Sequence, residues 1–264
     1  MNRLLIANFA RIKKNKLFWV LCGVMALTAI VMVVNAVSNR DTQIDGAMCA
    51  FAIPVEIAAA IFISIFFGTE YGDGTIRNKL IIGHDRRQIY FANLITAVIC
   101  LLAFAAAYML PVVIFGFPLV ALPTVQAVRM IAVGILTLFA FCSIYVMVSM
   151  IYSNKAGATV VNLVVAFLML FAALIIFSYL AVPEFYPVYG LEPGEAEYVR
   201  NPSYISGAKR TVLQALLDLL PAGQAIQLLT GMESPLWALP LYSAGVSVAC
   251  AGVGAFVFFK KDIK

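Results

Sequence analysis

Six apolar runs divide the chain, and each is long enough for a helix to cross the hydrocarbon core of a bilayer, which is about 30 Å thick. Composition agrees, because 63% of the 264 residues are hydrophobic and 12% are charged, whereas soluble domains carry about a quarter charged residues. The sequence therefore predicts an all-α membrane protein that forms one transmembrane domain over residues 1–264. The six spans are expected near residues 17–37, 51–68, 91–115, 129–150, 159–182 and 236–259.

Basic residues gather on one side of these spans. Most of the 18 lysines and arginines fall in residues 1–16, the 69–90 segment, the 151–158 loop and the C-terminal tail. Because basic loops stay on the cytoplasmic side, we expect a multi-pass protein with both termini in the cytoplasm and the 183–235 loop outside. This placement explains the net charge of +5, and no nucleic-acid partner is expected.

Residues 1–16 predict an amphipathic helix that lies in the inner headgroup layer. Leu5, Phe9 and Ile12 recur at helical spacing and share a face, whereas Arg11 and its basic neighbours point elsewhere. Membrane lipids, especially anionic ones, are therefore expected partners. The alternative is a basic flank that only sets the topology.

The 183–235 loop is the longest connection in the chain. Its first part is rich in proline and acidic residues and predicts irregular structure. A leucine stripe from Leu213 to Leu220 then predicts a short helix that stops at Pro221, and a second short apolar segment follows. Neither segment is long enough to span, so we expect two short helices that are either amphipathic at the outer surface or re-entrant.

The 69–90 segment is a polar island between two apolar runs. Asp73 is predicted to cap a short helix over residues 75–82, and Gly83 to end that helix in a left-handed conformation. Asp85 is expected to cap the third span.

This short helix is predicted to present an apolar knob. Ile76 and Leu80 lie four residues apart and share a face, while Arg77 and Lys79 point elsewhere. An apolar knob with a charged rim is suited to docking in the groove of a partner. The alternative is an ordinary loop whose arginines meet lipid phosphate. Two arginines are expected to anchor the segment at headgroup level, namely Arg86 and Arg87.

Residues 67–94, FGTEYGDGTIRNKLIIGHDRRQIYFANL, resemble the region after the second span of ABC-2 type permeases, the membrane subunits of one class of ATP-binding-cassette exporters. The C-terminal stretch 254–264 and the LLPAGQAIQLL stretch at 219–229 are also similar to that family. The positions that match the family pattern in the island are Glu70, Gly74, Thr75, Arg77 and Arg87.

The resemblance implies a subunit of an exporter in a bacterial cytoplasmic membrane. It implies docked ABC ATPases, a second permease subunit that is identical or a sister, and a drug, antimicrobial peptide or lipid-like substrate. The chain contains no G-x-x-x-x-G-K-[ST] loop, so ATP and Mg²⁺ are expected on the ATPase and no cofactor in this chain. The ATPase-coupling residues that it implies are Glu70, Tyr71, Asp73, Gly74, Thr75, Ile76, Arg77 and Leu80.

Glu56 lies near the outer end of the second predicted span, two residues after Pro54. A carboxylate at depth costs about 2.5–3.5 kcal/mol on insertion scales and usually faces a cavity or a polar partner. Glu56 is thus a candidate for the substrate path, where it would meet a cationic part of the substrate. The alternatives are that it reaches the outer interface or bonds to a neighbouring helix. Four other polar residues in the spans are predicted to join helices: Asn35, Asn93, Tyr145 and Asn162.

Other functions remain open beside the permease. A secondary transporter would show charged residues near the midplane and repeated halves, and a non-transporting scaffold or sensor could share the permease fold. An enzyme is not expected, because the one histidine, His84, and five unpatterned cysteines provide no metal site or H-E-x-x-H motif.

Overall fold

The computed structural model describes residues 1–264 apart from 42, 121, 190–195, 232–236 and 262–264. Within the described residues, six helical segments are long and apolar enough to cross a membrane, which confirms the all-α membrane fold. Two of them are interrupted: α3 (Asp45–Cys49) continues into α4 (Ala52–Gly72), and α6 (Arg86–Pro111) continues through η1 (Val112–Gly116) into α7 (Phe117–Leu119). The other four are α2 (Lys16–Ser38), α8 (Val125–Ile151), α9 (Lys155–Leu180) and α12 (Leu239–Lys260).

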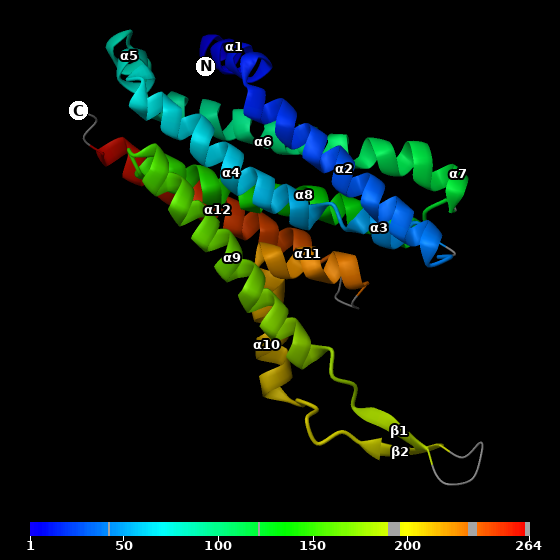
Figure 1. Ribbon diagram of the computed structural model, residues 1–264. Helices are drawn as coiled ribbons and strands as arrows, with labels where there is room; N and C mark the ends of the chain where they lie inside the picture. Colours follow the sequence, from blue (N-terminus) through cyan, green and yellow to red (C-terminus); the bar gives the residue numbers. More distant parts are fainter. Residues whose placement is uncertain (42, 121, 190–195, 232–236, 262–264) are drawn as a thin grey trace.

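The centre of the bundle is formed by α4 and α8 (Figure 1). In the most apolar stretch of the α3–α4 span 72% of the residues are buried, and in that of α8 61% are buried. By contrast, only 17% are buried in each of α9 and α12. Most of the surface of α4 is therefore already covered within this chain, whereas α9 and α12 leave broad apolar faces open.

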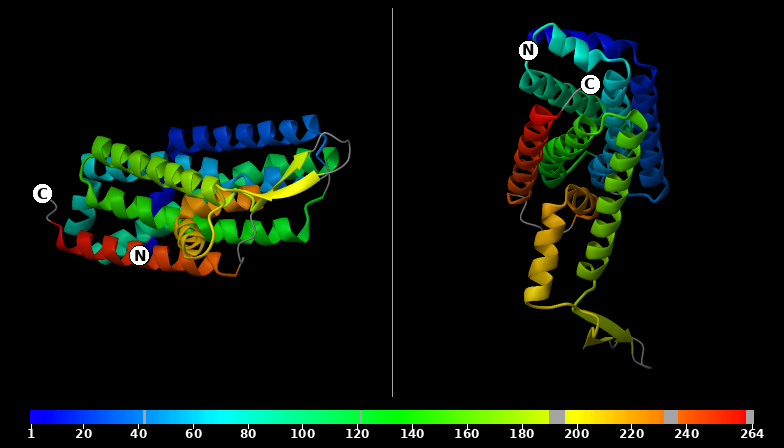
Figure 2. Two further views of the ribbon diagram at one scale, coloured as in Figure 1. Left: turned by 90° about the horizontal axis from the view of Figure 1, so that it is seen from below. Right: turned by 90° about the vertical axis from the view of Figure 1, so that its left-hand side faces the viewer.

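One end of the bundle carries α1 (Asn2–Lys14), the short helix α5 (Thr75–Ile81), the α8–α9 turn and the C-terminal end of α12 (Figures 1 and 2). We call it the basic end. The predicted amphipathic N-terminal helix is confirmed as α1, which packs against α6. Its buried face is centred on Leu4, Asn8 and Ile12, so a polar side chain lies in the middle of an apolar stripe.

The short helix α5 occupies the predicted place, but its cap differs. Gly74 is the capping residue, with a left-handed φ of +65°, and Asp73 instead ends α4. The prediction that Asp73 caps α5 is therefore wrong. Gly83 has a φ of +94°, which confirms the expected left-handed ending. Asp85 lies at the cap position of α6 without a side-chain capping hydrogen bond.

At the far end, β1 (Phe185–Tyr189) pairs antiparallel with β2 (Ala196–Arg200), and this hairpin projects away from the bundle (Figure 2). The prediction of irregular structure is wrong for these residues. Aromatic and valine side chains favour strands, and Pro187 is tolerated because both strands of a two-stranded sheet are edges.

Two short helices precede α12, as predicted: α10 (Ala208–Leu219) and α11 (Pro221–Thr230), with a bend of 101° between them. Residues 221–228 of α11 are all buried, and α11 packs against α8, α9 and α4. Thus α11 is inserted among the spans rather than lying on the outer surface, whereas α10 buries only Leu217 and Asp218. Gln224 holds α11 in place, because its Oε1 accepts from Thr137 Oγ1 at 2.8 Å and from Ser243 Oγ at 2.6 Å.

Candidate functional site

Glu70 is the centre of a buried charge cluster at the basic end. It lies in the last turn of α4 and is fully buried. Its Oε1 accepts from Lys79 Nζ at 2.7 Å and from Arg11, and its Oε2 accepts from Asn93 Nδ2 at 3.1 Å. Since Arg11 belongs to α1, Lys79 to α5 and Asn93 to α6, one carboxylate joins four elements.

Asn8 extends the same cluster from the buried face of α1. Its Nδ2 donates to Asn93 Oδ1 and to Thr96 Oγ1, both at 3.0 Å, and its Oδ1 accepts from Lys79 Nζ at 3.3 Å. Buried charges are tolerated only when they are paired and their remaining hydrogen bonds are satisfied. We call Asn8, Arg11, Glu70, Lys79, Asn93 and Thr96 the Glu70 cluster.

The sequence pattern does not reveal this cluster. Helical spacing predicts that Arg11 and Lys79 point away from the apolar faces of their helices, but Lys79 is buried and Arg11 is half-buried. The available hints are Asn8 between two buried apolar residues of α1, and Asn93 inside a span. Neither hint identifies the partner across the fold.

The expected apolar knob is also corrected. Ile76 is fully buried and Leu80 is half-buried against the core, so Ile76 does not present a docking face. The exposed apolar residues lie at the C-terminal end of α5: Ile81, its last residue, is 73% exposed, and Ile82, which follows it, is 77% exposed. Arg77 is exposed as expected.

Tyr71 forms a second contact at the basic end, between α4, α8 and the tail. Its hydroxyl donates to Met150 O at 2.5 Å, and Lys261 Nζ donates to both Tyr71 Oη and Met150 O at 3.1 Å. Burial lowers the pKa of Lys261 to about 8. The C-terminal end of α12 is thereby tied to the last turns of α4 and α8.

Arg86, which is predicted to anchor the segment at headgroup level, also bonds to another part of the chain. It donates to carbonyl oxygens at the C-terminal end of α12, namely Phe259 O at 3.0 Å and Lys261 O. Cations at a helix C-terminus are stabilising. Arg87 is exposed and lies 5.2 Å from the ring centroid of Phe259, and its role as an anchor stays a prediction.

Glu56 is fully buried in α4, and its Oε1 accepts from Tyr145 Oη at 3.3 Å. Among the described residues its Oε2 has no hydrogen-bond partner. The structure matches the alternative of a bond to a neighbouring helix, because Tyr145 belongs to α8, and a place in the substrate path stays a prediction. Further along α4, Ser64 Oγ accepts a hydrogen bond from Asn162 Nδ2 of α9 at 2.7 Å. The same amide group donates to Ser149 Oγ of α8 at 2.8 Å.

These bonds confirm that Asn93, Tyr145 and Asn162 join helices. The same prediction is wrong within this chain for Asn35, which is exposed and whose Oδ1 accepts from Asn39 Nδ2, one turn later, at 3.4 Å.

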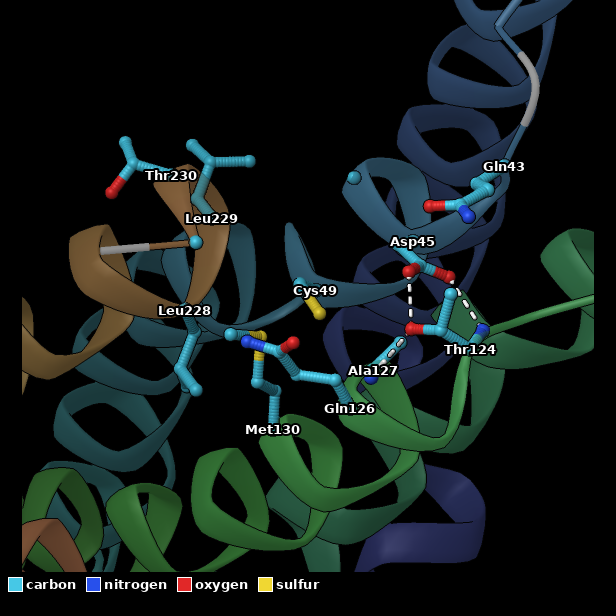
Figure 3. A pocket seen from close by; sticks show the side chains of 12 residues that line it. Gln43, Asp45, Cys49, Thr124, Gln126, Ala127, Met130, Leu228, Leu229 and Thr230 are labelled. Carbon is cyan, nitrogen blue, oxygen red and sulfur yellow. Dashed lines mark hydrogen bonds between the residues drawn. The ribbon is translucent and has the colours of Figure 1, made fainter. Parts of the chain in front are cut away.

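A pocket of about 480 Å³ opens at the far end, between α3, the start of α8 and the end of α11 (Figure 3). Asp45 accepts from the backbone N–H of Thr124 at 2.9 Å and from its hydroxyl at 2.5 Å. Thr124 in turn caps α8. Met130, Cys49 and Leu228 line the apolar side of this pocket. The carboxylate of Asp45 is thus engaged in holding Thr124 and the start of α8.

Comparison with known proteins adds one finding. A family model described as "ABC-2 family transporter protein" matches residues 4–169, from α1 into α9. A comparison with curated proteins finds no match.

Proposed function

We propose, from the premise that the chain belongs to the ABC-2 family of transporter proteins, that it is the permease subunit of an ATP-driven exporter. Permeases of this family are membrane components that lack the nucleotide-binding domain, so the chain is not itself an enzyme, and the family implies ABC ATPase partners. ATP and Mg²⁺ are then bound by the partner.

The Glu70 cluster is the observation that carries this proposal. It connects α5, a short helix at the basic end with one buried and one exposed side, with α4, the most buried span. Because a buried salt bridge is lost only at high cost, a displacement of α5 is transmitted to α4 rather than absorbed between them. Rigid-body rocking of helical bundles is a general means of alternating access in transporters.

We propose that the ATPase contacts α5 through Ile81 and Ile82, with Arg77 and Asn78 at the rim. An exposed apolar pair beside a positive charge fits a groove in a partner. Ile76 and Leu80 then serve the coupling from inside, since they fasten α5 to the core. The backbone around Asp73, Gly74 and Thr75 sets the angle at which α5 leaves α4.

The basic end is proposed to face the cytoplasm of a bacterial cell, with both termini inside. The open apolar face of α9 supports contact with a second permease subunit, identical or a sister, and with lipid. A substrate that is a drug, an antimicrobial peptide or lipid-like remains our proposal, with Glu56 as the candidate that meets its cationic part. Antimicrobial peptide resistance is the corresponding cellular role.

Copurification of the chain with an ABC ATPase coexpressed from the same genome tests the proposal. We expect the Ile81→Asp/Ile82→Asp variant to lose the ATPase while its melting temperature is unchanged, because both side chains are exposed. Ile6→Asp is the matched control, since Ile6 on α1 is 68% exposed and lies outside the proposed surface. An unchanged complex in the double variant would refute the docking surface.

Transport by the chain without any ATPase would instead establish a secondary transporter, and a complex that moves no substrate would establish a scaffold or sensor.

A further inference from the structure

A second pocket, of about 380 Å³, lies at the basic end between the last turns of α1 and α4. It opens where α2 begins at Lys16 and α4 ends at Gly72, which are the ends of two helices long and apolar enough to cross a membrane. Nearby, the exposed indole of Trp19 donates to Lys13 O at 3.1 Å, and tryptophan is enriched at the membrane–water interface. The residues that line the pocket are Ala10, Arg11, Lys14, Asn15, Phe66, Thr69 and Asp73.

Opposite charges line this pocket without pairing to each other. Lys14 and Asp73 are both exposed, and within the described part of the chain neither forms an ion pair at 4.0 Å or less. Arg11 adds a second positive charge, and its guanidinium lies 4.6 Å from the centroid of the Phe66 ring. Two cations and one carboxylate around an apolar floor match a ligand that carries both signs of charge.

Arg11 has donors to spare. It uses Nη1 for Glu70, whereas a guanidinium carries five N–H donors in a planar fork. Guanidinium and phosphate make strong charge-assisted hydrogen bonds. Lys14, three residues after Arg11 at the end of α1, supplies a further positive charge. Asp73 can accept hydrogen bonds from a primary ammonium group.

We propose that this pocket binds the phosphoethanolamine headgroup of a membrane phospholipid. The phosphate lies toward Arg11 and Lys14, the ammonium group lies toward Asp73, and the acyl chains follow the apolar surface beside Phe66. Arg11 is then shared between the lipid phosphate and Glu70. This consequence for coupling rests on the proposed function, whereas the binding itself requires only the membrane placement.

Trp19 provides a direct probe. The chain has two tryptophans, so Trp237→Phe leaves Trp19 as the only indole. We would reconstitute this variant in phosphatidylcholine vesicles and add either brominated phosphatidylethanolamine or brominated phosphatidylcholine. We expect Trp19 quenching to saturate at a lower fraction of the ethanolamine lipid, because choline cannot donate hydrogen bonds to Asp73.

Matched variants test the contacts. Lys14→Gln should raise the half-saturating fraction by about three- to fivefold, as for an exposed charge pair, whereas Lys13→Gln, one residue away and outside the pocket lining, should leave it unchanged. Asp73→Asn should abolish the preference over phosphatidylcholine. Equal quenching by both lipids, or equal effects of the two lysine variants, would overturn the proposal. Displacement by soluble phosphoethanolamine would overturn the lipid in favour of a soluble ligand. Copurification of Lys14→Gln with the ATPase separates a failure of the lipid site from a failure of the proposed function. A variant that loses the lipid preference but keeps the ATPase leaves the proposed function intact.

Discussion

Lys79 Nζ lies 2.7 Å from Glu70 Oε1 at the point where α5 folds back on the end of α4, and both side chains are buried. The two residues are nine apart in the sequence. Their pairing makes α5 part of the helical core rather than a loose loop at its surface.

Lys79→Met should destabilise the protein, because it removes one partner of a buried ion pair. We expect the free energy of unfolding to fall by about 3 kcal/mol, measured by thermal or denaturant unfolding in detergent. Arg77→Met is the matched control on the same helix, and its exposed side chain predicts a change within about 0.5 kcal/mol.

A double variant checks the cause of that loss. Glu70→Gln and Lys79→Met should cost less together than the sum of the two single losses, because each single variant already removes the contact between the two charges. Equal losses in Lys79→Met and Arg77→Met would show that the contact contributes nothing.

Glu56→Gln should reduce transport of a cationic substrate by about tenfold, the scale of a lost hydrogen bond to a charged group, and leave assembly intact. The amide is close in size to the carboxylate and can still accept from Tyr145. Tyr145→Phe is the companion variant, because it removes the bond and keeps the carboxylate. Unchanged export in Glu56→Gln would assign Glu56 a packing role alone.

Gly254→Ala should destabilise the contact between α12 and α6. A methyl group there would overlap the Tyr90 hydroxyl and lie 2.8 Å from Tyr90 Cζ, and overpacking costs about 1–3 kcal/mol. Tyr90→Phe should be neutral or stabilising, since that buried hydroxyl has no partner among the described residues. Melting temperatures of the single and double variants check this, and Tyr90→Phe should restore part of the loss.

The stability of the basic end should rise between about pH 8 and pH 10. Burial lowers the pKa of Lys261 from its ordinary 10.5 to about 8, so in this window the unfolded chain binds a proton that the folded chain has released. Stability rises with pH wherever the unfolded state binds more protons. Lys261→Met should flatten the curve of melting temperature against pH, and the neighbouring exposed Lys260→Met should not. Identical slopes for the wild type and Lys261→Met would contradict this assignment.

The spans and the C-terminal end of α5 could be predicted from the sequence, because they depend on local properties. Hydrophobic length determines which runs can cross a bilayer, and Gly83 tolerates a left-handed backbone that ends the helix. The pair of short helices was predictable for the same reason, since Pro221 cannot continue α10 and is well placed to begin α11.

The rotation of each helix about its own axis was decided only by tertiary packing. Helical periodicity predicts that Ile76 and Leu80 share a face, but it cannot say whether that face meets a partner or the core of the same chain. The same limit hid the Glu70 cluster, because Arg11 and Asn93 reach Glu70 from 59 and 23 residues away. By itself the sequence determined a six-span membrane protein with one basic end. Tertiary structure determined that two of those basic side chains turn inward, since a carboxylate buried at the end of α4 requires cations beside it.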